Sequence, residues 1–405
     1  MHLIRWLTSR TVRKACELED AVLKILNHQR DVLGANAVTA VEGALSEYRR
    51  VVRGGADRAA IEGQMVALEH VANKWLRPYP SHSLRENVLM LLEIAVLIVG
   101  SRAFLIQPMV IPTGSAQPTL WGVTFQDLRE TPGGGIPSLP VRLWEKAMGG
   151  VSYYHVTAPA DLEVTGWEDK ATMVIPLVKR QRLQTTAGPI TVWFPPDEFA
   201  VQLGLVDEMR RLKKQRFRKG EDIVRARVVT GDHLFVERVA YNFRRPERGE
   251  IIVFRSEQHP GMTANTHYIK RLVGLGGETI RIGDNRHTVI NGRELTTNDY
   301  GFAGVYSFDP ALPPRSNAYS GHVNGTVWQR TTGFMGPTRN FPNGATEVQI
   351  RPKHYVCFGD NTMNSADSRF WPEPDFPQKQ VIGKSWMVFW PFLRGGKWNV
   401  GWTAD

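Results

Sequence analysis

Cysteine is scarce in this chain of 405 residues, which contains only Cys16 and Cys357, far apart and without CxxC spacing. A zinc site built on several thiolates and a disulfide framework are therefore both excluded. The 11 histidines are scattered without an obvious ligand pair, and the sequence has no HExxH, GxSxG or P-loop motif. The run GLGG at 274–277 lacks the third glycine of a dinucleotide-binding loop. We therefore expect no metal and no cofactor.

Bulk composition indicates an ordinary folded protein. Apolar residues make up 42% and charged residues 22%, and the length suggests two or three domains. The 37 glycines and 25 prolines supply many turns, which favours a loop-rich β domain. The formal net charge of +10 suits either nucleic acid or an anionic membrane surface, and charge alone does not separate the two. Residues 1–12 are too short and too polar for a signal peptide.

The amino-terminal region is predicted to be helical. Across residues 1–76, apolar positions recur at helical spacing, as in VLKIL at 22–26, among many Ala, Glu, Leu and Arg residues. The pair Gly54-Gly55 is expected to divide this region into separate helices, and the prolines of RPYP (77–80) to end it.

One segment is long and apolar enough to cross a membrane. It is placed at residues 87–107, and its apolar run is VLMLLEIAVLIVGSRAFLIQ. Twenty residues of helix span about 30 Å, the thickness of the hydrocarbon core. The alternative is a buried core helix, which Glu93 and Arg102 favour because charged side chains are unfavourable in lipid. Arg102 lies near one end, where its side chain can reach the interface.

Flanking charges predict how this segment is oriented. The basic residues on its amino-terminal side are Lys74, Arg77 and Arg85. On the other side, no basic residue follows Arg102 before Arg129. The positive-inside rule then places residues 1–86 in the cytoplasm and residues 108–405 on the other side of the membrane.

After residue 107 the pattern becomes that of an antiparallel β domain, in which short β-branched and aromatic runs alternate with turn residues. The runs are HLFVERV (233–239), EIIVF (250–254), HYIKRLVG (267–274), HTVI (287–290), HYVCF (354–358) and WMVFW (386–390). Two stretches look inserted. Residues 123–229 mix loops, strands and a helix near 197–215, and residues 299–350 are rich in Gly, Pro, Asn and aromatic residues.

Three segments carry residues suited to catalysis. In MVIPTGSAQPTL (109–120), Ser115 lies in a Gly- and Pro-rich stretch just beyond the membrane segment. In HYIKRLVGLGGETI (267–280), strand alternation places Lys270 on one face with Leu272, where a charged amine is unfavourable unless it has a use. GDNTMNSADSRFW (359–371) is dense in hydrogen-bonding side chains. Taken singly, the three segments are also consistent with a surface loop, an edge-strand lysine and a tight polar turn.

Together these segments resemble the boxes of bacterial type I signal peptidases, the leader peptidases. The matching stretches are IPTGSAQPTL (111–120), GDHLFVERVAYNFRRPERGEIIVF (231–254), YIKRLVGLGGE (268–278) and GDNTMNSADSR (359–369). All four follow the family's order, and the first comes after a transmembrane segment as it does in the family. The resemblance implies a mainly β catalytic domain, with antiparallel sheets partly closed into a barrel, behind a single transmembrane helix and the helical amino-terminal region.

The resemblance also implies residue roles. Ser115 matches the nucleophile and Lys270 its general base, while Thr113 and the Ser115 backbone N–H match the donors to the oxyanion. Ser365 matches a serine that hydrogen-bonds and orients the lysine. The supporting positions, of which the last two match a buried ion pair, are Asp360, Asn364, Asp367 and Arg369. The apolar walls of the substrate pockets are matched by Pro108, Ile111, Ala116, Leu120, Tyr268 and Ile269.

Elementary chemistry agrees with a serine–lysine pair. A serine hydroxyl is a poor nucleophile until a base removes its proton, and a lysine can do so only when it is neutral. The reference pKa of lysine is about 10.4, and desolvation among apolar residues can lower it by several units. Ser–Lys pairs are an established variant of the catalytic triad.

Three departures from the family pattern are visible. Ala116 stands where a methionine is usual, so the pocket for the residue before the cut is expected to be larger and less strict. Gly276 replaces a proline in a turn, and residues 123–229 place more chain between Ser115 and Lys270 than compact family members have. None of these changes removes a catalytic group.

The expected activity is an endopeptidase that removes amino-terminal signal peptides from exported preproteins after small residues. It is expected in the bacterial cytoplasmic membrane, with its catalytic domain on the extracytoplasmic side. Its expected partners are exported preproteins, the lipid bilayer and the secretion translocon, and not nucleic acid. Two alternatives are a non-catalytic membrane-tethered β-scaffold that binds exported chains and a self-cleaving Ser–Lys protease of the repressor type. The membrane segment, and the lack of a helix-turn-helix pattern before it, disfavour the second alternative.

Two features lie outside the boxes. The basic run RRLKKQRFRKG (210–220) is interpreted as a solvated helix end or as a contact for anionic headgroups. Aromatic residues near the carboxyl terminus suggest an interfacial surface, although some of them belong in a core: Trp386, Trp390, Phe392, Trp398 and Trp402.

Overall fold

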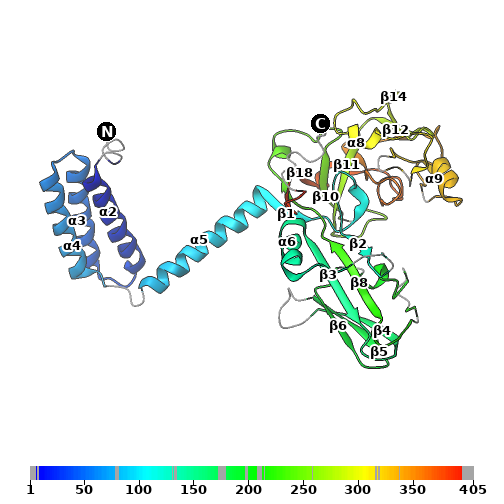
Figure 1. Ribbon diagram of the computed structural model, residues 1–405. Helices are drawn as coiled ribbons and strands as arrows, with labels where there is room; N and C mark the ends of the chain where they lie inside the picture. Colours follow the sequence, from blue (N-terminus) through cyan, green and yellow to red (C-terminus); the bar gives the residue numbers. More distant parts are fainter. Residues whose placement is uncertain are drawn as a thin grey trace. The chain divides into compact units, whose positions relative to one another are not determined.

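The computed structural model describes residues 6, 9–77, 82–129, 131, 135–171, 179–196, 199–207, 212–213, 215–257, 259–314, 317, 320–336 and 338–394. The chain divides into two compact units, Met1–Val96 and Leu97–Asp405 (Figure 1). The predicted fold class is confirmed, because helices, one long apolar helix and a mainly β remainder follow each other along the chain.

Within the described residues 9–77, the amino-terminal unit forms the helices α2 (Arg10–Gln29), α3 (Ala35–Arg53) and α4 (Arg58–Trp75). Their buried apolar residues recur at helical spacing and share one core: Val12, Ala15, Val22, Leu26, Val41, Leu45, Tyr48, Val52, Ile61, Leu68, Ala72 and Leu76. The break predicted at Gly54-Gly55 separates α3 from α4. A second break, at 30–34, was not predicted. Pro78 and Pro80 lie outside the described residues, and α4 has already ended at Trp75.

Helix α5 (His82–Phe104) contains residues 87–104 of the predicted membrane segment 87–107. Its window Glu86–Phe104 is long and apolar enough to cross a membrane, and none of that window is buried inside the protein. This exposure argues against a core helix. The predicted boundary at residue 107 needs correction, because Ile106 pairs with Glu237 and begins strand β1 (Ile106–Val110). Strand pairing therefore ends the helix before the apolar run itself ends.

The second unit is built on an antiparallel seven-stranded sheet in the order β1-β9-β18-β10-β11-β16-β17. Besides β1, its strands are β9 (His233–Glu237), β10 (Ile251–Arg255), β11 (His267–Leu275), β16 (His354–Phe358), β17 (Phe376–Pro377) and β18 (Val381–Trp390). Alternate residues of β10 enter different cores, with Ile251 and Val253 on one face and Ile252 and Phe254 on the other. The segment after β1 contacts β11 although three strands separate the two, so the sheet curls back on itself as a partly closed barrel.

A second sheet, in the order β14-β13-β12-β15, contains β12 (Thr279–Ile282), β13 (Thr288–Ile290), β14 (Arg293–Glu294) and β15 (Val348–Gln349). The predicted insertion 299–350 supplies β15 and two short helices, α8 (Ala303–Tyr306) and α9 (Gly325–Thr332). Its Phe302 and Phe341 pack with Ile280 and with Phe358 of the main sheet in one buried cluster. This insertion is therefore packed directly onto the catalytic sheet.

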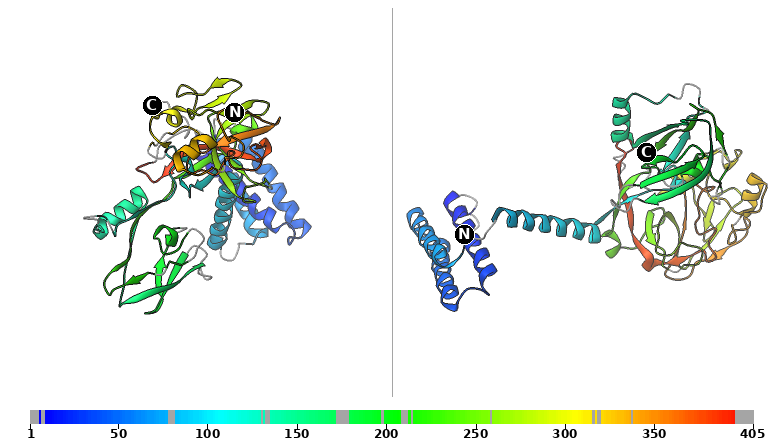
Figure 2. Two further views of the ribbon diagram at one scale, coloured as in Figure 1. Left: turned by 90° about the vertical axis from the view of Figure 1, so that its right-hand side faces the viewer. Right: turned by 90° about the horizontal axis from the view of Figure 1, so that it is seen from below.

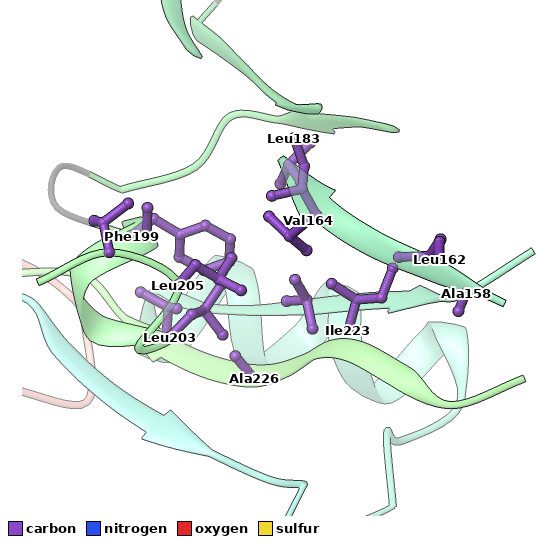
Figure 3. Packing of buried hydrophobic residues seen from close by; sticks show 14 residues of the cluster. Ala158, Leu162, Val164, Leu183, Phe199, Leu203, Leu205, Ile223 and Ala226 are labelled. Carbon is purple, nitrogen blue, oxygen red and sulfur yellow. The ribbon is translucent and has the colours of Figure 1, made fainter. Parts of the chain in front are cut away.

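The predicted insertion 123–229 is a β module with its own hydrophobic core. Its strands are β2 (Thr124–Asp127), β3 (Val151–Thr157), β4 (Leu162–Ala171), β5 (Lys179–Thr185), β6 (Ile190–Trp193), β7 (Arg216–Phe217) and β8 (Asp222–Val229). They form two sheets, in the orders β2-β8-β3 and β6-β5-β4-β7. Figure 3 shows Val164, Leu183, Phe199 and Ile223 among the side chains that meet between them.

The helix predicted near 197–215 is wrong for the described part of that range, which contains only the short helix α7 (Phe199–Gln202). Gly204, with φ of +70°, turns the backbone so that Leu203 and Leu205 both enter the core. The apolar pattern is thus satisfied by a buried loop. The basic run 210–220 lies partly outside the described residues, and its described part contains strand β7, so it is not a helix end.

Candidate active site

Ser115 lies in a 3₁₀ turn shortly after β1, with its side chain buried and 6% exposed. The Ile111 N–H, before the turn, donates to the Asp232 carbonyl at 2.9 Å. The Trp121 N–H, after the turn, donates to the Asp232 carboxylate at 2.7 Å. A Cβ at Gly231 would lie 1.7 Å from the Ile111 carbonyl oxygen, so only glycine allows this approach. The pair Gly231-Asp232 therefore holds both ends of the serine segment.

Lys270 lies in the middle of β11, opposite Ile252 of β10, and is 5% exposed. Its Nζ donates a hydrogen bond to Ser115 Oγ at 2.7 Å. Burial lowers the pKa of the Lys270 amine, and the Asp367 carboxylate acts in the opposite direction without cancelling that effect. A buried amine that favours its neutral form, in contact with a hydroxyl, is suited to act as general base for a nucleophile.

The loop 359–371 packs against the serine turn. Asn361 donates to it twice, from its backbone N–H to the Ser115 carbonyl at 3.1 Å and from its side chain to the Gly114 carbonyl at 3.0 Å. A Cβ at Gly359 would lie 2.5 Å from the Ser115 carbonyl oxygen. A side chain at position 359 would therefore push this loop away from the serine.

A buried ion pair stabilises the same loop. Asp367 and Arg369 have no exposed side-chain surface, and Arg369 donates to both carboxylate oxygens at 2.9 and 2.8 Å. The Gly359 N–H donates to Asp367 at 2.8 Å. Burial alone would raise the pKa of the Asp367 carboxyl, but Arg369 and the hydrogen bonds outweigh it, so the pKa is lowered. The carboxylate thus keeps its charge beside the lysine.

A second buried ion pair and its hydrogen bonds join all four of the sequence boxes. Arg271 Nε and Nη2 donate to the two oxygens of Asp360 at 2.7 and 2.6 Å, and each side chain is 2% exposed. The Thr119 hydroxyl also donates to Asp360, at 2.5 Å, and Arg271 Nη1 donates to the Gly249 carbonyl at 2.7 Å. This bidentate pair ties β11 to the loop and to the serine segment.

No three His, Cys, Asp or Glu side chains of the described residues gather as metal ligands would.

Comparison with known proteins identifies the family. The family described as signal peptidase, peptidase S26, matches residues 218–390, which include Lys270 and the loop 359–371. The chain is 27% identical over 225 residues to the signal peptidase I of Pseudomonas fluorescens, covering 50% of this chain and 74% of that protein. The chain is similar to proteins of the signal peptidase I family. The names of these relatives support peptidase activity on signal peptides.

Other signal peptidase I relatives match over a similar region. The protein of Leptolyngbya laminosa is 29% identical over 171 residues, covering 41% of this chain and 64% of that protein. The protein of Bacillus amyloliquefaciens is 30% identical over 162 residues, covering 40% and 66%. The chain thus spans slightly less than two thirds of these two relatives. A solved signal peptidase I from Enterococcus faecalis V583 matches at 23% identity with a TM-score of 0.23, covering 35% of this chain and 97% of that one, which adds nothing to the family assignment.

The residues predicted to assist Ser115 and Lys270 are not equally buried. Ser365 is buried beside Gly359, but its hydroxyl has no hydrogen-bond partner within the described residues, so the predicted bond to Lys270 is absent. The lysine amine is directed to Ser115 Oγ instead. Thr113 is exposed in extended backbone just before the serine turn. Asn364 is also exposed, and its backbone N–H donates to the Asn361 carbonyl at 3.0 Å.

The six predicted pocket residues lie in three surroundings. Ile111, Ala116 and Leu120 are buried in one apolar cluster beneath the serine turn, and Ile269 packs against it. Tyr268 packs in another cluster, with its ring centroid 5.8 Å from that of Phe254. Pro108 is exposed on β1. The apolar floor of the site is thus formed by residues of the serine segment.

Sequence reasoning did not single out Asp232, Asn361, Arg271 or Thr119. The strand pattern contained a signal for Arg271, because a residue next to Lys270 must face the other side of β11, and a buried arginine there needs a carboxylate. Nothing in the sequence indicated which carboxylate, because Asp360 approaches only when the main sheet curls.

Proposed function

We propose that this chain is a membrane-anchored endopeptidase that removes signal peptides from exported preproteins, with Ser115 as nucleophile and Lys270 as general base. The single observation that carries the proposal is the 2.7 Å hydrogen bond between Lys270 Nζ and Ser115 Oγ in a buried site where the neutral amine is favoured. The family's relatives supply the substrate class.

In the first half of the reaction, Lys270 Nζ takes the proton of Ser115 Oγ as this oxygen attacks the carbonyl carbon of the scissile peptide bond. The Ser115 backbone N–H and the Thr113 hydroxyl donate to the oxyanion that forms. Protonated Lys270 then gives its proton to the amide nitrogen, and the C–N bond breaks. The mature chain leaves with a free amine, and the signal peptide stays as an ester on Ser115.

In the second half, neutral Lys270 takes a proton from a water molecule whose oxygen attacks the ester carbonyl. The C–O bond to Ser115 breaks, the serine oxygen regains a proton, and the signal peptide leaves with a carboxylate. One lysine thus serves both steps, as base and then as acid.

The free edge of β11 provides a docking place for an extended substrate. Its residues 267–271 pair with β10 on one side, whereas on the other side β16 pairs only with 271–275. Beside 267–270 the edge has no strand partner among the described residues. A substrate strand there would gain main-chain hydrogen bonds and lie alongside Lys270.

Small residues are expected before the cut, because Ile111, Ala116 and Ile269 fill the floor of the site with apolar atoms. Ala116 is 3% exposed, so Ala116→Met adds atoms where little space exists. Ala116 was predicted from the sequence to make this preference less strict. Wild type and this variant are therefore compared in the cleavage of preproteins that differ only in the residue before the cut. If relative rates stay equal, position 116 does not determine the preference.

For topology we propose that residues 1–86 are cytoplasmic and that the peptidase unit is extracytoplasmic, in a single-pass protein of the bacterial cytoplasmic membrane. The basic flank of α5 supports this orientation, and the apolar window Glu86–Phe104 supports the anchor. Preproteins that emerge from the secretion translocon would then meet the enzyme at the outer surface. Protease added to intact spheroplasts should digest the carboxyl-terminal unit only, and protection of that unit would overturn the orientation.

The decisive test uses the full chain in liposomes with a preprotein that carries alanine at the first and third positions before the cut. Ser115→Ala and Lys270→Ala should each lower the cleavage rate by at least about a thousandfold. Lys379→Ala, which removes an exposed lysine of the same unit, serves as a matched control and should keep full activity. The rival function, a non-catalytic scaffold, requires that wild type binds the preprotein without cutting it.

A further inference from the structure

Helix α6 (Leu139–Gly149) exposes apolar side chains to solvent. Leu139, Leu143 and Trp144 are 63%, 59% and 62% exposed. Because they lie one, four or five positions apart, they share one side of the helix, to which exposed Ala147 also belongs. A surface helix of a soluble domain normally turns such a stripe toward the core.

The opposite side of α6 faces the protein and carries Arg142 and Glu145 together with the apolar Met148. The helix packs on β3, with Arg142 and Glu145 half-buried. Glu145 lies against Tyr153 of β3, where burial and then the hydrogen bond with Glu145 raise the pKa of the phenol. Figure 2 shows α6 at the margin of its unit in both views. The helix therefore turns charged side chains toward the protein while it exposes leucine and tryptophan side chains to solvent.

The end of β18 extends this apolar surface. Phe392 and Leu393 are 61% and 72% exposed, and the Leu393 N–H donates to the Met148 carbonyl of α6 at 3.2 Å. Trp390 Nε1 donates to the Ala147 carbonyl at 2.9 Å. The combined surface is termed the α6 patch and consists of Leu139, Leu143, Trp144, Phe392 and Leu393. Trp398 and Trp402, which the sequence linked to an interfacial surface, lie outside the described residues.

The connection to α5 indicates what covers the patch. The register places Val110 of β1 opposite His233, and His233 opposite Trp390, so β1 ends where α6 is attached. From Phe104, the last residue of the membrane window, to Val110 the chain can span at most about 20 Å. The point where α6 is attached is thus within reach of a bilayer that holds α5.

The charged residues of α6 also suit contact with a lipid bilayer. Exposed Lys146 and half-buried Arg142 border the apolar stripe, and the one acidic residue of the helix, Glu145, faces β3. A stripe of leucine and tryptophan bordered by basic residues is typical of helices that lie in the lipid interface, where the basic groups meet anionic headgroups.

We propose that the α6 patch lies in the surface of the lipid bilayer and forms a second membrane contact beside α5. The proposal rests on the membrane anchoring in the proposed function. A single helix holds the unit at one point, whereas a second contact also fixes its orientation to the bilayer. The free edge of β11 is then held at a constant height and angle to chains that leave the bilayer.

Spin labelling measures the contact without any need for catalysis. The full chain carrying Cys16→Ser and Leu143→Cys is labelled with a nitroxide and reconstituted into vesicles that contain anionic phospholipid. The label should be accessible to oxygen and protected from an aqueous nickel reagent. The matched control label at Phe334→Cys, which replaces a 77% exposed residue of the other insertion, should be accessible to nickel. Equal nickel accessibility at both positions would overturn the proposal, and a label shielded from both reagents would show a protein partner instead.

A variant connects the contact to activity. The triple variant Leu139→Glu, Leu143→Glu and Trp144→Glu should cleave a preprotein in vesicles severalfold more slowly than wild type, while it cleaves a short peptide in detergent at the wild-type rate. The control variant Phe334→Glu and Met335→Glu should match wild type in both assays. Equal rates of all three proteins in vesicles would contradict the orienting role. If wild type cleaves nothing, the proposed function fails, and the spin-label result still decides the lipid contact.

Discussion

The loop 359–371 and helix α6 break the ordinary burial rule in opposite directions. The loop buries the charged groups of Asp360, Asp367 and Arg369, whereas α6 exposes Leu143 and Trp144. Each buried charge of the loop has an opposite charge within hydrogen-bond distance. The apolar side of α6 has no such cover among the described residues. The buried charges of the loop are therefore stabilised by partners within the protein. The apolar side of α6 would have to be covered by something outside it.

Lys270 differs from both regions. It is buried like the charges of the loop, but burial lowers the pKa of its amine, so less free energy is needed to remove its charge than for an exposed lysine. A buried amine that no carboxylate holds charged is available for proton transfer, which the paired guanidinium groups of Arg271 and Arg369 are not.

Removing one partner of the fully buried ion pair should have the largest effect. Asp367→Asn leaves Arg369 charged and unpaired, which should lower the free energy of unfolding by about 3–5 kcal/mol. Urea unfolding of the full chain in detergent measures this. Glu62→Gln, which breaks the exposed pair with Arg58, is the control and should change it by less than about 0.5 kcal/mol. Equal effects of the two substitutions would contradict the account of the loop.

Replacing the catalytic amine should make the protein more stable while it abolishes cleavage. The folded state lowers the pKa of Lys270, so protonation of the amine favours the unfolded state. Below both pKa values, each pKa unit by which the folded value is lower reduces stability by about 1.4 kcal/mol. Lys270→Met should therefore unfold at a higher temperature at pH 7. This advantage should shrink as the pH rises toward the ordinary lysine value, where the unfolded amine also becomes neutral. A variant less stable than wild type at pH 7 would contradict a net penalty for burying the amine.

Loss of one hydrogen bond in the network should have a moderate effect. Thr119→Val removes the donor to Asp360 but leaves the Arg271 pair intact, so the free energy of unfolding should fall by about 1 kcal/mol. The same urea experiment measures the change. An unchanged midpoint would mean that the hydroxyl does not contribute to holding Asp360.

A charge on α6 should have the smallest effect on stability. Leu143 is 59% exposed, so Leu143→Glu should change the free energy of unfolding in detergent, measured for the second unit's transition by near-ultraviolet circular dichroism, by less than about 0.5 kcal/mol. A loss above about 2 kcal/mol would show that Leu143 packs inside the protein, and α6 would then belong with ordinary core helices.

The sequence pattern predicted the strands well because they are short, β-branched and bounded by turn residues. The runs at 250–254 and 354–358 correspond closely to β10 and β16. The pairing of Ser115 with Lys270 came from the family resemblance, since no local pattern shows that a sheet will curl.

Other features could not be predicted from the sequence, for physical reasons. The break at 30–34 contains only one glycine and no proline, so composition did not mark it. The apolar residues of α6 suggested no buried helix face, because they are not buried. Near 197–215 an apolar run enters the core through a loop, and periodicity alone does not separate such a loop from a helix. The hydroxyl of Ser365 has no partner within the described residues, which no motif could indicate.

The most direct test of the central claim is the pH dependence of kcat/KM for cleavage of a preprotein by the full chain in liposomes. Because burial lowers the pKa of Lys270, activity should rise with pH along a single ionisation whose midpoint lies well below the ordinary lysine value of 10.5. Lys270→Met should show no activity at any pH. A midpoint at the ordinary lysine value, or cleavage by Lys270→Met, would contradict the assignment of Lys270 as the general base for Ser115.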